Sequence, residues 1–174
     1  MNLNEEKKYF LKDQFWSLTI SAAFSRANVY AKNLSKEMES EKFTFKYKLF
    51  KFIDEMVSSQ YGLRKVEEEQ HIENIISIQK FTNEFEVILE KKHLSVGVCQ
   101  KLLNLYLKYL WCANIIEFTP PHFPLDRLIQ GKKIYTNWTE LEDSTQYKEI
   151  INKIRNEQNK AIWELEEYNA ILRK

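Results

Sequence analysis

Glycine is scarce in this sequence: the 174 residues include only Gly62, Gly97 and Gly131. A loop that cradles phosphate groups needs several glycines close together. These three lie more than thirty residues apart. Their spacing therefore argues against a P-loop and against a dinucleotide-binding fold.

Cysteine is also rare, because Cys99 and Cys112 are the only two in the chain. Two cysteines this far apart are too few for a disulfide scaffold or a zinc cluster. We expect two buried free thiols in a reducing compartment, and no metal or cofactor. The charged segment 1–14 lacks the apolar core of a signal peptide, and no apolar run approaches the ~20 residues of a membrane span. We therefore expect a cytoplasmic protein without membrane contact.

Neither sign of charge dominates, since 26 basic residues face 25 acidic ones for a net charge of +1. This balance excludes a globally basic protein that coats nucleic acid, but it leaves room for a local basic face. The hydrophobic content of 44% and the chain length suit one domain that buries roughly two-thirds of its unfolded surface.

Helical periodicity dominates the chain. It predicts an all-α fold, a single compact domain of six to seven helices spanning residues 1–174. The segment 43–50, FTFKYKLF, alternates apolar and polar residues and would also suit a short strand; we favour a helix because no partner strand is visible. The predicted helices cover 5–33, 41–61, 66–90 with a break near 82–83, 95–113, 125–130, 147–154 and 162–172.

The helix predicted over 95–113 is apolar nearly all round, which is typical of a buried helix. Lys101, Asn104 and Lys108 nevertheless share one side of it, at positions i, i+3 and i+7. Such a stripe is either a solvated face or a set of polar groups that meet an acid or line a pocket. Ser95 is a preferred N-cap, so the helix start either is simply capped or offers free N–H groups to a phosphate. Gly97 would let another backbone approach closely.

The segment 120–131, PPHFPLDRLIQG, contains all three prolines of the protein. It predicts a rigid approach to a short helix, with Pro124 and Asp126 in the first turn. Asp126 is the acid that could meet Lys101, although an ordinary helix-start aspartate produces the same pattern. His122, between the prolines and the acid, is expected to be exposed.

The segments LSVGVCQKLLNLYLKYL and FPLDRLI together resemble the helix-hairpin-helix DNA glycosylases, loosely the archaeal 8-oxoguanine glycosylase group. The resemblance covers about forty residues. It implies a helix-hairpin-helix-like fold, DNA as the partner, Lys101 as the catalytic nucleophile and Asp126 as the catalytic acid. The sequence departs from the family at Ser95, where a first hairpin glycine would be expected, and it lacks the cysteines of an iron–sulfur cluster.

This chemistry suits the two residue types. A lysine is a nucleophile only when its amine is neutral, and we expect the apolar helix to favour the neutral form of Lys101. The amine would attack the sugar C1′ of a flipped nucleotide and form a Schiff base. Asp126 would accept a proton or stabilise positive charge on the sugar.

Further residues fit a DNA site, although core packing or loop solubility explains each of them as well. Aromatic side chains can stack on an extruded base, and polar groups can hold it or contact phosphates. The candidate base pocket is Asn104, Trp111, Phe123 and Trp138. The candidate DNA-binding residues are Ser95, Gly97, Lys108, Arg127, Lys132 and Lys133.

The alternative is a non-catalytic helical interaction or accessory protein, such as one of a mobile element, with a protein as its partner. Trp138, Trp163 and Tyr168 could form its aromatic anchor surface, or they could close the core. A metal nuclease would need clustered carboxylates or histidines. The string VEEEQHIE at 66–73 is instead expected to make a solvated helix start, and His71 and His93 show no metal-ligand spacing.

Overall fold

The structure, a computed structural model, describes residues 2–131, 137–155 and 159–173, and within these ranges it contains seven α-helices and no strand. The predicted all-α fold of six to seven helices is therefore confirmed. Shorter helical turns, named η1 to η3, occupy Val57–Tyr61, Asn83–Phe85 and Trp138–Glu140. The helices are α1 (Leu3–Phe24), α2 (Lys36–Met56), α3 (Glu68–Thr82), α4 (Val96–Cys112), α5 (Arg127–Gln130), α6 (Ser144–Ile154) and α7 (Lys160–Leu172).

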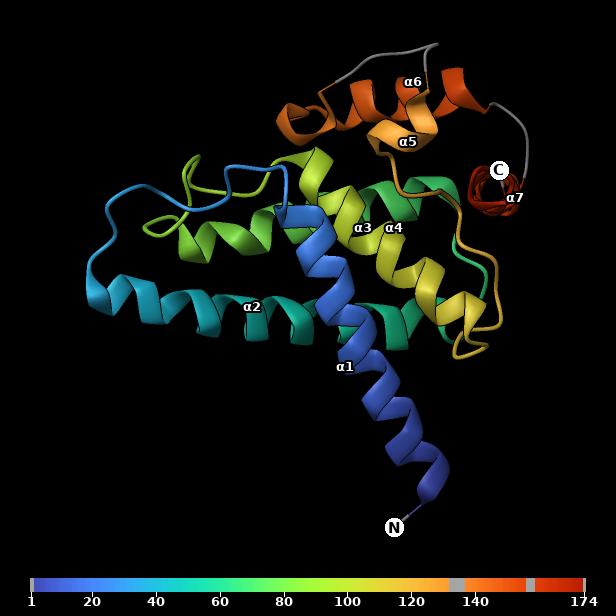
Figure 1. Cartoon of the computed structure of the whole chain (residues 1–174), viewed down its shortest axis with the longest axis horizontal. Helices are drawn as coiled ribbons and strands as arrows, with labels where there is room; N and C mark the ends of the chain where they lie inside the picture. Colours follow the sequence, from blue (N-terminus) through green and yellow to red (C-terminus); the bar gives the residue numbers. More distant parts are fainter. Residues whose placement is uncertain (1, 132–136, 156–158, 174) are drawn as a thin grey trace.

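Helix α4 lies in the middle of the fold, with α1 across one side and α3 along another (Figure 1). Its position follows from its sequence, because a helix that is apolar on nearly every side must be covered on every side. Each residue from Val96 to Asn104 is buried. Helix α6 packs on α3 and α4, and α5 packs on α7. The 120–131 segment thus lies between α4 and the C-terminal helices.

The predicted helix boundaries agree with the structure where a capping residue marks them. Ser95 caps α4 by accepting a hydrogen bond from the backbone N–H of Val98. Gly62 follows the end of η1, and Gly131, at φ +59°, ends α5. The segment 43–50 is helical within α2, and the predicted break falls at the end of α3. The helix predicted to continue to residue 90 was wrong, because only the short turn η2 follows α3. The first helix, predicted over 5–33, is shorter at its C-terminal end, because α1 already ends at Phe24.

The first half of α1 projects beyond the rest of the molecule (Figure 1). Residues 2–10 are all exposed, whereas Trp16, Thr19 and Ala23 further along the helix are buried. The periodic apolar residues near the start of the chain correctly predicted a helix. They did not predict that this part of the helix has nothing to pack against.

The two cysteines differ in their surroundings. Cys99 is buried in the core as expected, and burial raises the pKa of its thiol well above the ordinary value. Cys112, at the end of α4, is exposed, so the prediction of a second buried thiol was wrong. Across the described ranges, every helix is too short or too polar to span a bilayer.

Candidate functional site

Lys101 and Asp126 are in direct contact, with 2.5 Å between the Nζ atom and Oδ2. Lys101 is buried, and only 7% of its side chain is exposed, whereas 27% of the Asp126 side chain is exposed. Asp126 is also the N-cap of α5, because its other oxygen, Oδ1, accepts the N–H groups of Leu128 and Ile129. One carboxylate therefore fixes the start of α5 and holds the ammonium at the same time.

Trp138, in η3, covers the same amine: the Lys101 Nζ atom lies 5.5 Å from the centroid of its ring. An ammonium over an indole face is stabilised by the negative potential of the ring. Trp138 is itself buried. It is therefore the one aromatic residue of the predicted base pocket that the structure brings to Lys101.

Lys108 meets a different acid. Its Nζ atom lies 2.8 and 2.7 Å from the two carboxylate oxygens of Glu164 on α7, and 4.3 Å from the ring centroid of Tyr168. Burial raises the pKa of Glu164, while the neighbouring Lys108 opposes that rise. Because its ammonium is enclosed by Glu164 and Tyr168, the structure contradicts the assignment of Lys108 to DNA-phosphate contacts.

The start of α4 is covered by the chain around η3. The Ser95 hydroxyl donates to the carbonyl of Thr139 over 2.7 Å, and the N–H of Gly97 donates to the carbonyl of Leu141 over 2.9 Å. A Cβ atom on Gly97 would lie only 1.5 Å from the Trp138 carbonyl oxygen. The close approach of another backbone at Gly97 is thus confirmed. The assignment of Ser95 and Gly97 to phosphate binding is contradicted, because their groups already bond to the chain itself.

Two of the remaining base-pocket residues are fully buried and engaged elsewhere. Asn104 donates to the Phe123 carbonyl oxygen and to the Tyr147 hydroxyl. The Phe123 ring packs 5.4 Å, centroid to centroid, from Trp163. The structure contradicts both assignments, because neither side chain is accessible to an extruded base.

Trp111 is half-buried against the core. It lies ten positions after Lys101, which is about 15 Å along the helix axis. It therefore does not share a pocket with the amine, and this assignment too is corrected.

Of the basic residues proposed near Asp126, Arg127 is exposed at the first position of α5. It could reach a ligand that approaches Asp126. Lys132 and Lys133 lie outside the described residues.

The aromatic anchor surface proposed for an interaction protein is not assembled as expected. Trp138 is buried, the ring of Trp163 packs on Phe123, and Tyr168 covers Lys108. Within the described ranges these side chains close the structure around α4.

A buried polar network, which the sequence analysis missed, joins α3, α4, α6 and the proline-rich segment. His71 and His122 are both fully buried, so the expectation of an exposed His122 was wrong. The string 66–73 does start α3 with Glu67, Glu69 and Glu73 exposed, as expected, but His71 within it points into the core. The His71 Nε2 atom lies 2.8 Å from Asn104 Oδ1. The His122 Nδ1 atom lies 2.9 Å from the Tyr147 hydroxyl.

The hydrogen bonds of this network have a defined direction. The Asn104 amide donates to the Tyr147 hydroxyl, so Tyr147 can donate its own proton to Nδ1 of His122. On the other side, Tyr61 accepts from an asparagine amide and lies 2.8 Å from Nδ1 of His71. A neutral form of each histidine with its proton on Nε2 is compatible with all of these contacts. Burial lowers the pKa of each, well below the ordinary value for His71.

The network reaches the surface at Glu68, whose Oε1 atom lies 3.5 Å from Nε2 of His122. Lys160 binds the other oxygen of Glu68 over 3.1 Å. The contact with His122 and the ammonium of Lys160 lower the pKa of Glu68 to about 2, against the opposing effect of partial burial. Glu68, Lys148 and Lys160 line a polar hollow of about 390 Å³. No local sequence signal joins these residues, which come from three separate helices.

Comparison with protein-family models, with curated proteins and with solved structures finds no match. In the part of the chain that the structure describes, no three His, Cys, Asp or Glu residues are grouped so as to hold a metal ion. Function must therefore be inferred from the residues of this chain and their geometry.

Proposed function

We propose that the Lys101–Asp126 pair is the reactive centre of a DNA glycosylase-like enzyme that acts on a flipped nucleotide. The contact of 2.5 Å between the amine and the acid carries the proposal. The two residues are 25 positions apart in the sequence and come from different helices. Lys101 belongs to a helix whose other sides are apolar, and Asp126 is the more exposed member of the pair. A substrate would therefore approach past Asp126 and the exposed Arg127.

The proposed reaction uses the pair in one order. Asp126 takes a proton from the Lys101 ammonium, and the neutral amine attacks C1′ of the sugar as the base leaves with the electrons of the glycosidic bond. Asp126 then gives that proton to the departing base. Opening of the sugar ring then gives a Schiff base between Lys101 and C1′. Borohydride reduces that Schiff base to a stable amine and so links protein to DNA.

The test is borohydride trapping on DNA that contains either an abasic site or 8-oxoguanine. The wild-type protein is expected to form a covalent adduct, and Lys101→Ala is expected to form none. Asp126→Asn should slow adduct formation at least tenfold, because asparagine keeps the N-cap of α5 but removes the carboxylate. Lys42→Ala is the control, since it removes a lysine of a surface ion pair and should leave both the fold and trapping intact.

Two results would refute the proposal. One is the lack of an adduct with the folded wild-type protein on either DNA. The other is an adduct that persists in Lys101→Ala. Thermal unfolding of every variant would show whether a lost adduct reflects lost folding instead.

The second candidate is a non-catalytic helical interaction protein. It is supported by exposed apolar side chains on α1 and α2, among them Tyr9, Phe10 and Phe43, and no longer by the tryptophans near the C-terminus. Such a protein would give no adduct. Both proposals include a cytoplasmic location, which we infer only from the two free thiols, Cys99 and Cys112.

A further inference from the structure

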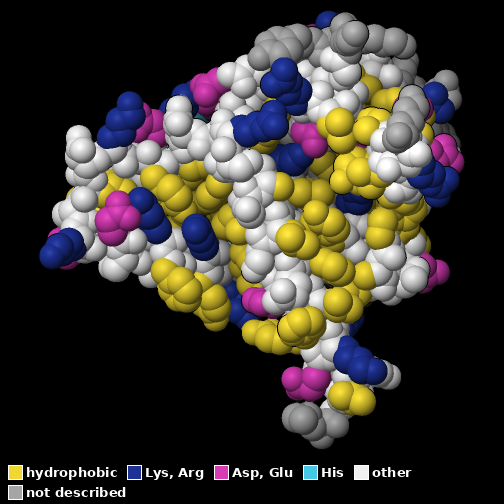
Figure 2. All heavy atoms as spheres, in the orientation of Figure 1, with side chains coloured by type: hydrophobic (Ala, Val, Ile, Leu, Met, Phe, Trp, Pro, Cys, Tyr) yellow, Lys and Arg dark blue, Asp and Glu magenta, His cyan; other side chains and the backbone are white. Residues whose placement is uncertain are grey.

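An apolar hollow of about 500 Å³ lies between α1 and α2. We call it the α1–α2 groove. Its lining includes Trp16, Ile20 and Phe24 from α1 and Phe43, Tyr47 and Phe50 from α2. Figure 2 shows hydrophobic side chains gathered over these two helices. Monomeric proteins rarely leave a large contiguous apolar patch uncovered unless it is a binding surface.

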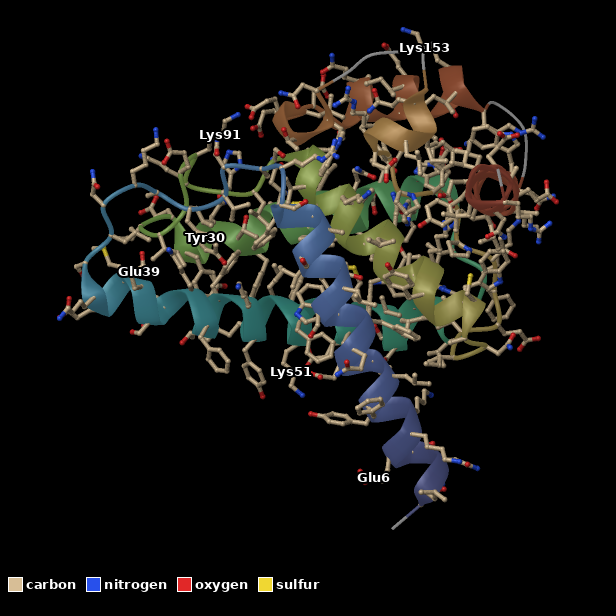
Figure 3. The ribbon with its side chains drawn as sticks, viewed as in Figure 1. Glu6, Tyr30, Glu39, Lys51, Lys91 and Lys153 are labelled. Atoms are coloured by element: carbon tan, nitrogen blue, oxygen red, sulfur yellow. The ribbon has the colours of Figure 1, made fainter. Side chains whose placement is uncertain are left out.

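The apolar stripe of the groove continues onto the projecting end of α1. Tyr9 precedes Trp16 by seven positions, and Phe10 precedes Ser17 by seven, so each lies on the same side of the helix as a residue that lines the groove. Their exposed fractions are 64% and 61%. Figure 3 places Glu6 on this projecting end, away from every other element. The projecting end, residues 2–10, is thus a ridge with the same apolar character as the groove beside it.

The ridge cannot fill the groove of its own chain. Residues 3–24 form one continuous helix, so its first half points away from the body and cannot turn back. A nine-residue helical end without packing is also only marginally stable by itself. A chain that carries both a ridge and a matching groove on one face can satisfy both at once across a two-fold axis.

We propose that the α1–α2 groove is occupied by the projecting end of α1 from a second copy of this chain, in a symmetric dimer. With the two α1 helices antiparallel about an axis beside Asp13 and Gln14, Tyr9 of each copy comes beside Ile20 of the other, a residue of the groove lining. Phe10 comes opposite the small Ser17. Glu6 reaches the region of Lys46, a basic residue of the groove lining.

The exposed apolar area of the ridge and the groove is of the size that a dimer interface needs. A fully covered aromatic side chain buries about 150–250 Å², and Tyr9, Phe10, Phe43 and Tyr47 are each more than half exposed. These four provide on the order of 400 Å² on each copy. Leu3, seven positions before Phe10 and 64% exposed, adds to it. A standard interface buries about 800 Å² per partner, so the four aromatic residues supply about half.

The test is the molar mass of the full chain across the micromolar range, measured by light scattering and sedimentation. The wild-type protein is expected to be a dimer. Phe10→Glu on the ridge and Phe43→Glu in the groove should each weaken dimerisation at least tenfold without unfolding the protein, because both side chains are mostly exposed. Leu63→Glu is the matched control: Leu63 is 72% exposed outside this surface, and its variant should remain dimeric.

Mixing the two interface variants gives a sharper result. Neither variant retains an intact ridge-and-groove contact with itself, but a heterodimer of Phe10→Glu with Phe43→Glu retains one. The mixture should therefore dimerise more tightly than either variant alone. A monomeric wild-type protein, a dimer that both variants leave unchanged, or a mixture that stays monomeric would overturn the proposal. None of these outcomes depends on borohydride trapping, so the two proposals succeed or fail separately.

Discussion

At the scale of single residues, the effect of replacing a lysine of α4 on stability depends on the acid with which that lysine pairs. Lys101 pairs with an acid that remains in part open to solvent, whereas Lys108 pairs with Glu164, of whose side chain only 4% is exposed. Removal of one partner from a buried pair leaves the other charge without compensation. The two lysines of one stripe are therefore expected to behave differently.

Lys108→Met is expected to lower the free energy of unfolding at neutral pH by about 3 kcal/mol, since Glu164 is left buried as an unpaired charge. The raised pKa of Glu164 fixes the sign of the pH dependence. A carboxyl whose pKa is raised by folding binds its proton more readily in the folded state. The loss should therefore shrink as the pH falls through that pKa. Urea unfolding of the variant from pH 7 to pH 4 checks this.

The matched control is Lys108→Met combined with Glu164→Gln, which removes both charges and should recover part of the lost stability. A Lys108→Met loss that grows on acidification would contradict the argument. Surface pairs such as Lys42 with Glu39 should contribute less than about 1 kcal/mol.

At the scale of elements, the buried network joins three helices through hydroxyl, amide and imidazole groups. Tyr147 lies at its centre, because it accepts from Asn104 on α4 and donates to His122 in the proline-rich segment. Without that hydroxyl, Nδ1 of His122 would lose its partner in the core, whereas the Asn104 amide would keep its bonds to Gln100 and to the Phe123 carbonyl. A buried polar group that is left unpaired lowers the free energy of unfolding by more than its hydrogen bond adds to it.

Tyr147→Phe is accordingly expected to destabilise the fold by about 2 kcal/mol. Ser40→Ala is its control, because it likewise removes one hydroxyl oxygen, here from an exposed residue outside the groove, where water can replace its hydrogen bonds. The two variants differ from wild type by the same single oxygen atom. Equal unfolding midpoints for both would show that the network contributes nothing to stability.

Most helices could be predicted from the sequence, because periodicity and capping residues are local signals. Ser95, Gly62 and Gly131 mark boundaries that the structure confirms. Asp126 was identifiable from the prolines that precede it. The partner of Lys108 was not, because Glu164 lies 56 residues away and only the packing of α7 brings the two together.

Burial was predicted less well for polar residues. A histidine in a charged or proline-rich string usually faces water, and nothing local indicates that His71 and His122 each meet a tyrosine from another segment. The opposite error occurred at the start of the chain. Phe10 belongs to a helical apolar pattern, yet it is exposed, because a pattern does not show whether a partner surface exists.

At the scale of the whole molecule, the two buried histidines set a pH dependence of stability. Burial lowers the pKa of His71 and of His122 in the folded state, so the unfolded chain binds protons more readily below about pH 6.5. Stability is then fully present above that pH and falls as the solution is acidified, by up to about 1.4 kcal/mol per pH unit for each histidine.

Chemical unfolding at pH 7 and at pH 5 checks this expectation, and equal free energies at the two values would contradict it. Glu68 should add a second loss at lower pH. Its folded-state pKa of about 2 lies below its unfolded value, so its contribution disappears as the pH falls from about 4.5 towards 2.

The covering of the start of α4 by the chain around η3 has a consequence for synthesis of the protein on the ribosome. The carbonyl groups that complete this helix start belong to Thr139 and Leu141, and the acid that neutralises Lys108 comes later still, at Glu164. A nascent chain that has emerged only as far as Cys112 therefore carries its most apolar segment without these covers. The cover of the central helix is complete only after α7 has been synthesised, so the growing chain must keep this segment from aggregating until α6 and α7 have left the exit tunnel.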